Sequence, residues 1–127
     1  MKKLTLIFAA FLLLINFAVE AQTVVPVKSI TVNNLKQRIK TDSSLIILDV
    51  RTPAELEGPL GEIEGVVNIP VEQLENRIGE LEKYKDREIA VICRAGHRSL
   101  KGTRILLSHG FRNVENVEGG MEVFRQK

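Results

Sequence analysis

Three short apolar runs, separated by more polar segments, dominate the pattern of the chain after residue 28, and they lie at residues 45–50, 66–69 and 88–93. The runs are largely continuous and do not alternate with polar positions. Strands that are covered on both faces, as in parallel sheets, show this pattern. Two further short strands are expected near Ile30 and at residues 114–117.

Segments with a helical period fall between these strands. Thr31 suits a helix N-cap. Val32, Leu35 and Ile39 then follow at the spacing of one helix face. A helix that ends near Lys40 is therefore expected.

A second helix start is marked by Thr52, Pro53 and Glu55. A capping hydroxyl, a proline at the first helical position and a glutamate at the third form a capping box. Pro70 then precedes an amphipathic segment with apolar residues at 71, 74, 78 and 81.

The end of the chain predicts two more helices. One is expected over residues 99–109, closed by Gly110. Gly119 and Gly120 form a turn into a last short helix. Its apolar residues are Met121, Val123 and Phe124.

Alternating strands and helices of this length predict one α/β domain over residues 29–127. Its central sheet is expected to be mainly parallel, with helices on both faces. Ligands of such folds bind beyond the carboxyl ends of the strands.

The first 21 residues have the pattern of a secretory signal peptide. Lys2 and Lys3 precede an apolar run that ends near Ala21, the expected cleavage site. Residues 22–28 are then a leader segment, and the protein is expected to be exported, either periplasmic or secreted. Retention of the run as a membrane anchor is the alternative, but the run is shorter than the ~20 apolar residues of a spanning helix.

Composition and charge narrow the classes of partner. The chain has 127 residues and a formal net charge of +2, and its charges after residue 28 alternate in sign. A nucleic-acid binder shows a basic stripe, and a membrane-surface protein shows a basic amphipathic helix. We therefore expect no nucleic-acid partner, and no membrane partner once the signal is cleaved.

Cys93 is the one cysteine of the chain and ends an apolar strand before a predicted helix. Thiolates are favoured at helix N-termini and beside cations, and Arg94 and Arg98 supply such charge. Gly96 allows successive N–H groups to turn inward as an anion-binding nest. The competing interpretation is that Cys93 is an inert, buried hydrophobe.

The loop resembles the active-site loop of the rhodanese family in residues, spacing and setting. The loop residues are Cys93, Arg94, Ala95, Gly96, His97, Arg98 and Ser99. The similarity extends to Asp49–Glu55, Gly65–Pro70 and Glu118–Gly120. The resemblance therefore covers nearly all of the chain after the leader segment.

This resemblance implies a rhodanese-like three-layer α/β fold and a sulfurtransferase activity of the thiosulfate sulfurtransferase type. Sulfane sulfur from a small donor such as thiosulfate would load Cys93 as a persulfide, and a thiol or cyanide acceptor would remove it. A protein acceptor is an additional candidate. No metal and no organic cofactor is implied.

Within this interpretation Cys93 is the nucleophile, and the six residues that follow it bind substrate. Asp49 and Arg51 are expected to form an ion pair that supports the site. A persulfide carrier or binding module without turnover is the main alternative. A phosphatase or arsenate reductase is a minor one, because such enzymes place five residues between Cys and Arg, whereas four separate Cys93 from Arg98.

The sequence departs from the family pattern in several places, among them Phe124, where the family often has a Trp. Glu62 and Glu64 lie where the family has other residues, and they are expected to be solvated. Gly102 lies inside a predicted helix, which costs about 1 kcal/mol relative to Ala, so close packing on the sheet is expected there.

Overall fold

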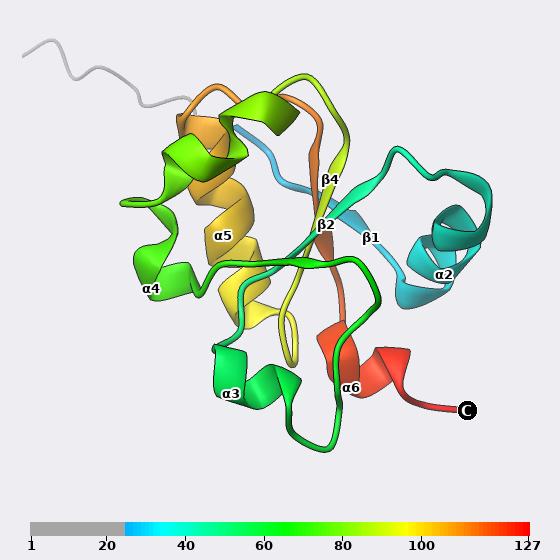
Figure 1. The fold of residues 1–127 in the computed structure, drawn as a ribbon. Helices are drawn as coiled ribbons and strands as arrows, with labels where there is room; N and C mark the ends of the chain where they lie inside the picture. The colour runs from blue at the N-terminus through cyan, green and yellow to red at the C-terminus, as the bar shows by residue number, and fades with distance from the viewer. Residues whose placement is uncertain (1–24) are drawn as a thin grey trace, which may run out of the picture.

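Five parallel strands form one sheet in the computed structural model, which describes residues 25–127 (Figure 1). Their order across the sheet is β1-β5-β4-β2-β3. The strands are β1 (Lys28–Ile30), β2 (Ile46–Asp49), β3 (Val67–Asn68), β4 (Ile89–Ile92) and β5 (Val114–Val117).

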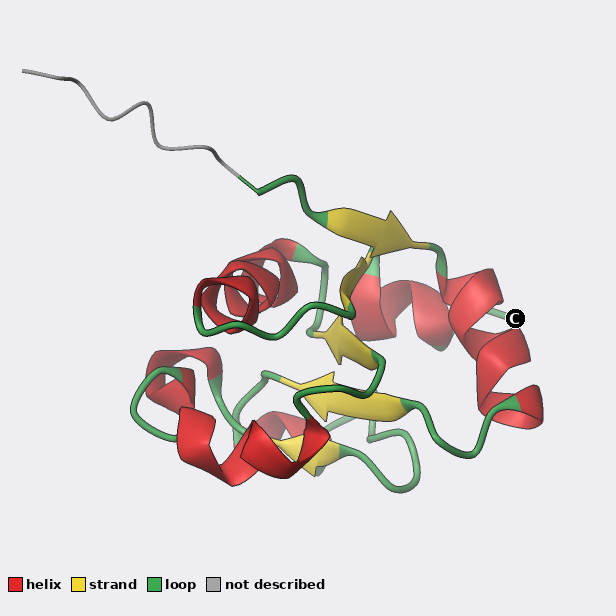
Figure 2. Ribbon diagram, turned by 90° about the horizontal axis from the view of Figure 1, so that it is seen from above, coloured by secondary structure: helices red, strands yellow, loops and turns green. Residues whose placement is uncertain are grey.

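Helices cover both faces of this sheet, as Figure 2 shows. One face is covered by α2 (Val32–Thr41) and α6 (Gly120–Phe124). The other is covered by α4 (Val71–Leu74), a 3₁₀ segment η1 (Ile78–Tyr84) and α5 (His97–Ser108). The short helix α3 (Pro53–Leu56) follows β2 at the carboxyl edge of the sheet. The predicted fold class is confirmed: a parallel α/β sheet between two helical layers.

Continuous apolar runs form the strands because each strand feeds two cores. In β4 all four residues are buried, and alternate side chains point to opposite faces. Val91 belongs to the core under α5, whereas Ala90 and Ile92 belong to the core under α2. A strand between two helical layers has no solvent face, so it carries no alternating polar pattern.

The capping box predicted for the second helix is present at the start of α3. The Thr52 side chain accepts the N–H of Glu55, and the Glu55 carboxylate accepts the N–H of Thr52 at 2.8 Å. Thr31 likewise caps α2 by accepting the N–H of Asn34 at 3.1 Å. Local sequence therefore fixes both of these helix starts.

Two segments differ from their sequence-based descriptions. Helix α5 begins at His97, two residues earlier than predicted, because Gly96 takes a left-handed conformation and serves as its N-cap. The amphipathic segment after Pro70 forms the short helix α4 and then the separate segment η1. Both are held by their apolar residues, since Leu74 and Leu81 are fully buried.

The close packing expected at Gly102 is present. A β-carbon there would lie 3.3 Å from side-chain atoms of Val50 and Val91, so α5 approaches the sheet more closely than an alanine would allow without adjustment.

The predicted signal peptide (residues 1–21) and most of the leader segment lie outside the described residues. None of the helices within residues 25–127 has the length and apolar character needed to cross a bilayer.

Candidate active site

The candidate site lies at the carboxyl edge of the sheet, where two neighbouring strands send the chain in opposite directions. From β2 the chain continues to β3 on one side, and from β4 it continues to β5 on the other. In open α/β sheets this divergence leaves a crevice that binds ligands. Arg51 follows β2 and Cys93 follows β4, so both lie beside the crevice.

The sulfur of Cys93 lies beside the first turn of α5. The N–H of Gly96 donates to Sγ over 3.1 Å, and the thiol contacts Ser99 Oγ at 3.3 Å. The N-terminus of a twelve-residue helix carries free N–H groups and partial positive charge, which stabilise an anion. Cys93 is 1% exposed, so its side chain is almost fully enclosed.

Two glycines permit this loop conformation. Gly96 has a φ of 107°, a value that L side chains rarely adopt. Gly120 lies so close to the loop that a β-carbon there would come within 2.5 Å of the carbonyl oxygens of Cys93 and Arg94. These two carbonyls accept the N–H groups of Met121 at 2.8 Å and Glu122 at 3.0 Å. The start of α6 therefore holds the cysteine loop in place.

Arg98 does not donate to the sulfur, because its guanidinium is held by Glu55. Its two terminal nitrogens donate to the two carboxylate oxygens of Glu55 over 2.8 and 2.7 Å. This pair, reinforced by hydrogen bonds from Thr52, lowers the pKa of Glu55 from 4.5 to about 2. The same carboxylate raises the pKa of Arg98, to which the nearby Cys93 sulfur also contributes.

Arg94 is also paired. Its Nε donates to Glu122 over 2.9 Å, and the two side chains are largely exposed at the rim of the site. The positive charge predicted beside the sulfur is therefore present, but each arginine carries a carboxylate with it. Among the described residues, the amide that reaches Sγ itself is that of Gly96, and the predicted nest of several amides is not formed around the thiol.

Asp49 and Arg51 form the predicted ion pair, and both side chains are almost fully buried. Arg51 donates to the two carboxylate oxygens of Asp49, at 2.7 Å from Nη2 to Oδ2 and 3.0 Å from Nε to Oδ1. Arg51 also donates to the carbonyl of Gly61 over 2.8 Å. The pair thus ties the end of β2 to the loop that follows α3.

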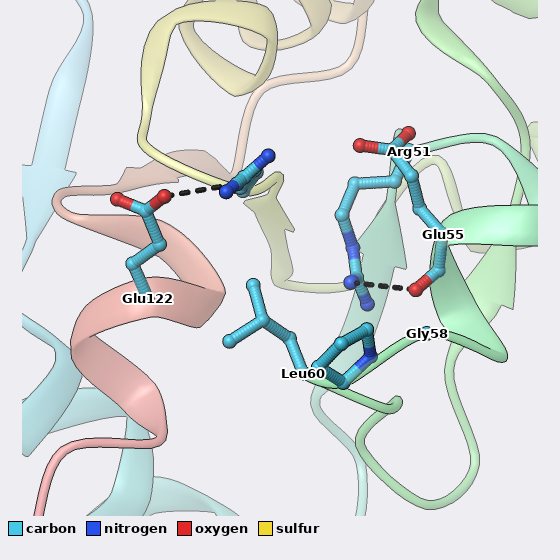
Figure 3. Close-up of a pocket in the computed structure, with 7 residues that line it drawn as sticks. Arg51, Glu55, Gly58, Leu60 and Glu122 are labelled. Atoms are coloured by element: carbon cyan, nitrogen blue, oxygen red, sulfur yellow. Dashed lines mark hydrogen bonds and ion pairs between the residues drawn. The ribbon is translucent and has the colours of Figure 1, made fainter.

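A cavity of about 380 Å³ opens over this edge (Figure 3). Arg51 and Glu55 lie on one side of it, and Glu122 lies across from them. Seven residues line it: Arg51, Glu55, Gly58, Pro59, Leu60, Arg94 and Glu122. The cavity is large enough for a small-molecule thiol and has an apolar wall at Leu60.

The other predicted site residues take different places. Ala95 and His97 are exposed, whereas Ser99 is fully buried beneath the loop. Glu62 and Glu64 are exposed and do not line the cavity, in agreement with the expectation that they are solvated.

Three residues of this region were not singled out as site residues from the sequence. Glu55 was recognised only as a capping residue, and nothing in the sequence marks Glu122. Asn116 contacts Ser99 from β5, with 2.7 Å between Ser99 Oγ and Asn116 Oδ1. A signal for Asn116 existed, because residues 114–117 read Val-Glu-Asn-Val, and a polar side chain inside a buried strand requires a partner.

The fold and the loop together define an α/β protein that holds one sulfur at a helix N-terminus, at the carboxyl end of its central strand. The chain belongs to the Rhodanese-like domain family, whose sequence model matches residues 31–127. This is a family of sulfurtransferases and sulfur carriers.

Individual relatives show the same relationship. The chain is 32% identical over 95 residues to "Sulfurtransferase" of Allochromatium vinosum, covering 75% of this chain and 85% of that protein. It is 40% identical over 95 residues to "Putative sulfur carrier protein YrkF" of Bacillus subtilis, covering 75% of this chain and 49% of that longer protein. A rhodanese-related protein from Thermoplasma volcanium superimposes with a TM-score of 0.67 at 36% identity, covering 76% of this chain and 89% of that one.

Proposed function

We propose that this protein is a sulfurtransferase that moves sulfane sulfur from a small donor to a thiophilic acceptor through a persulfide on Cys93. The observation that carries the proposal is the setting of Sγ: it accepts the N–H of Gly96 at the N-terminus of α5, and the residue that follows Cys93, Arg94, lines the cavity. An N–H donor to the sulfur and a helix N-terminus beside it are features of reactive cysteines, whose nucleophilic form is the thiolate.

The reaction has two displacement steps. The Cys93 thiolate attacks the outer sulfur of thiosulfate, a new S–S bond forms, and sulfite leaves with the electron pair of the broken bond. Cyanide or a thiolate then attacks the outer sulfur of the persulfide. The Cys93 thiolate is released again, so the cycle needs no external oxidant or reductant.

The protein supplies electrostatic stabilisation and position to these steps. The outer sulfur of a persulfide extends from Sγ towards the cavity, where the free N–H groups of the α5 N-terminus and the charge of Arg98 stabilise it. Glu55 and Glu122 also face this space. Because each is paired with an arginine, they neutralise positive charge that would otherwise attract a dianion, so uncharged or zwitterionic donors and acceptors suit the mouth at least as well as thiosulfate does.

The test is thiocyanate formation from thiosulfate and cyanide, combined with the intact mass of the purified protein. Wild-type protein is expected to gain the mass of one sulfur atom on incubation with thiosulfate and to lose it on addition of cyanide. Cys93→Ser is expected to show neither change. Ser108→Ala, a substitution at the far end of α5, is the control and should behave as wild type. Absence of sulfur loading with every donor tested contradicts the proposal.

A persulfide carrier that delivers sulfur to a partner protein is the second candidate. It is favoured by the burial of Cys93 and by the carboxylate held on each arginine, both of which limit turnover with small anions. A protein that loads sulfur stoichiometrically but forms no thiocyanate is expected in this case. Loading and turnover together favour the enzyme.

We further propose that the protein is exported, with residues 1–21 removed as a signal peptide. Support comes from the lysines at positions 2 and 3, the apolar run after them and the Ala21 boundary. In a bacterial host the intact mass of the protein recovered from the periplasmic fraction should correspond to a chain that begins at Gln22. A full-length mass in the membrane fraction contradicts cleavage.

A further inference from the structure

A chain of hydrogen-bonding groups, buried as far as Asn116, runs from the candidate sulfur through the sheet to the exposed Ser29. Cys93 Sγ lies 3.3 Å from Ser99 Oγ, and Ser99 Oγ lies 2.7 Å from Asn116 Oδ1. The amide nitrogen of Asn116 lies 3.5 Å from Ser29 Oγ on the edge strand β1. Ser99 and Asn116 are 0% and 5% exposed, so water does not substitute for these partners.

The hydroxyl of Ser99 has more acceptors around it than protons to give. It has one hydrogen, and it faces Asn116 Oδ1 and, at 3.0 Å, the carbonyl of Gly96. When Cys93 is a thiol, its S–H donates to Ser99 Oγ and the serine donates onward to Asn116 Oδ1. When the sulfur is ionised it becomes a third acceptor, and the serine must turn its proton towards Sγ.

Asn116 can supply the missing donor, because a side-chain amide has an acceptor end and a donor end of nearly the same shape. Rotation of the amide by a half turn places Nδ2 beside Ser99 Oγ. The other end of the amide then faces Ser29, whose hydroxyl both donates and accepts and so tolerates either orientation. The rearrangement moves no backbone atom.

We infer that Asn116 is a positioning residue for the sulfur anion: its amide turns to donate to Ser99, which frees the Ser99 hydroxyl to donate to Cys93. The residue does not touch the substrate and acts through Ser99 alone. This inference rests on the proposed function only in that Cys93 must ionise, and it does not depend on which molecule gives or takes the sulfur.

The charged groups near Sγ come from several elements. Arg98 on α5 interacts with the sulfur electrostatically and is paired with Glu55 on α3. Arg94 in the loop is paired with Glu122 on α6, and the Asp49–Arg51 pair lies at the carboxyl end of β2. Neither Ser99 nor Asn116 is a member of any of these pairs, so the titration of Cys93 in variants of these two residues is expected to report on the hydrogen-bond chain.

The first test uses the rate of Cys93 alkylation by iodoacetamide across pH. Asn116→Asp has the same shape but, when ionised, offers only acceptors. The Ser99 hydroxyl then donates to this carboxylate and is not free to donate to Cys93 Sγ. A hydrogen bond to a charged group contributes enough that about tenfold slower alkylation at pH 7 is expected, with the pH midpoint moved upward. Asn113→Asp places the same charge at an exposed position and should change the rate less than about twofold.

A double variant separates action through Ser99 from direct charge repulsion. In the Ser99→Ala background, Asn116→Asp is expected to slow alkylation by less than about twofold, because the group through which Asn116 acts has been removed. The inference is overturned if Asn116→Asp reacts as wild type, or if it slows the reaction equally in both backgrounds.

A second measurement uses the wild-type protein and needs no substitution in the sheet. The side-chain NH₂ resonances of Asn116 in an ¹⁵N spectrum should shift with pH along the same curve as Cys93 alkylation. The shift should be absent in Ser99→Ala and present in the control Ser108→Ala. Resonances that stay constant through the titration overturn the inference even if Asn116→Asp fails to fold. The two proposals fail separately. If the wild-type protein forms no thiocyanate but the Asn116 resonances still shift with pH, the proposed enzymatic function is contradicted and this inference stands.

Discussion

Two clusters of charged side chains in this protein are built from the same residue types but differ in what surrounds them. The first is the site cluster, formed by the pairs Asp49–Arg51, Glu55–Arg98 and Glu122–Arg94. The second, the amino-edge cluster, lies near the amino ends of β4 and β5, where Glu115 accepts from Lys28 and Arg38, and Arg38 also donates to Glu88.

The difference lies in how the charges are connected. In the amino-edge cluster one arginine joins two carboxylates and fastens α2 to the sheet, so the charges are shared within a network. In the site cluster each arginine has one carboxylate, and the pairs stand around a cavity and a sulfur atom. Similar ion pairs therefore secure an element in one place, while in the other they neutralise arginines beside a cavity.

The largest expected effect is on the fully buried pair of the site cluster. Asp49→Asn leaves the Arg51 guanidinium charged and without its partner, which costs about 3–5 kcal/mol of unfolding free energy. Replacing both residues by Leu and Met is expected to cost less than Asp49→Asn alone, because no unpaired charge remains. Urea denaturation measures both variants. A loss below about 1 kcal/mol for Asp49→Asn contradicts the assigned role of the pair.

In the amino-edge cluster the corresponding substitution should cost less. Glu115→Gln removes one carboxylate, but Arg38 keeps Glu88 as a partner, so a loss of about 1–2 kcal/mol is expected in the same denaturation assay. Alkylation and sulfur loading of Cys93 should remain unchanged, since the cluster lies away from the loop. A changed alkylation rate would show that the two clusters are coupled.

Glu55→Gln tests control of charge at the mouth and predicts a pH dependence. The pKa of Glu55 is about 2 in the folded protein against an ordinary 4.5, so its pair stabilises the fold above pH 4.5 and loses this effect as pH falls towards 2. The pair is about one third exposed, so its contribution is about 1 kcal/mol or less. The variant should lack this acid-dependent component.

Glu55→Gln should improve the binding of thiosulfate although it lowers the stability of the fold. Without Glu55 the charge of Arg98 is free to face an incoming anion, so the KM for thiosulfate is expected to fall several-fold. Glu57→Gln, at an exposed position just after α3, is the matched control for the loss of one negative charge. An equal change of KM in both variants would indicate a general charge effect and not release of Arg98.

The smallest effect is expected at the exposed end of the amino-edge cluster. Lys28 is 73% exposed, and its pair with Glu115 adds to one that Arg38 already makes. Lys28→Gln should therefore change the unfolding free energy by less than about 0.5 kcal/mol and should leave Cys93 unaffected. A larger loss would mean that β1 depends on this contact for its place at the edge of the sheet.

Sequence reasoning succeeded where a residue's role depends on its immediate neighbours. The capping box at Thr52, the strand that ends at Cys93 and the tight packing at Gly102 follow from local propensity and from burial pattern. The ion pair of Asp49 and Arg51 was also predicted, because the two residues lie at the end of one strand, at the same edge of the sheet as the cysteine loop. Each of these features is present in the structure.

Contacts between distant segments could not be predicted in the same way. Arg98 pairs with Glu55, which is 43 residues distant in the sequence, and Arg94 pairs with Glu122, which is 28 residues distant. Long charged side chains reach many partners, and the choice depends on the packed positions of α3 and α6. The number of amides that reach Sγ itself could not be predicted for a related reason: the left-handed turn at Gly96 starts α5 early and directs one N–H at Sγ. The nest around an atom carried on the sulfur stays a prediction.

The contact between Gly120 and the cysteine loop gives the end of the chain a part in completing the site. The carbonyls of Cys93 and Arg94 obtain their partners from Met121 and Glu122, which a ribosome adds nearly thirty residues after the cysteine. During synthesis the sulfur is therefore present well before the groups that fix its loop. The loop therefore obtains these two hydrogen bonds only once the last helix has docked, so the geometry around the sulfur is among the last features of the fold to be completed.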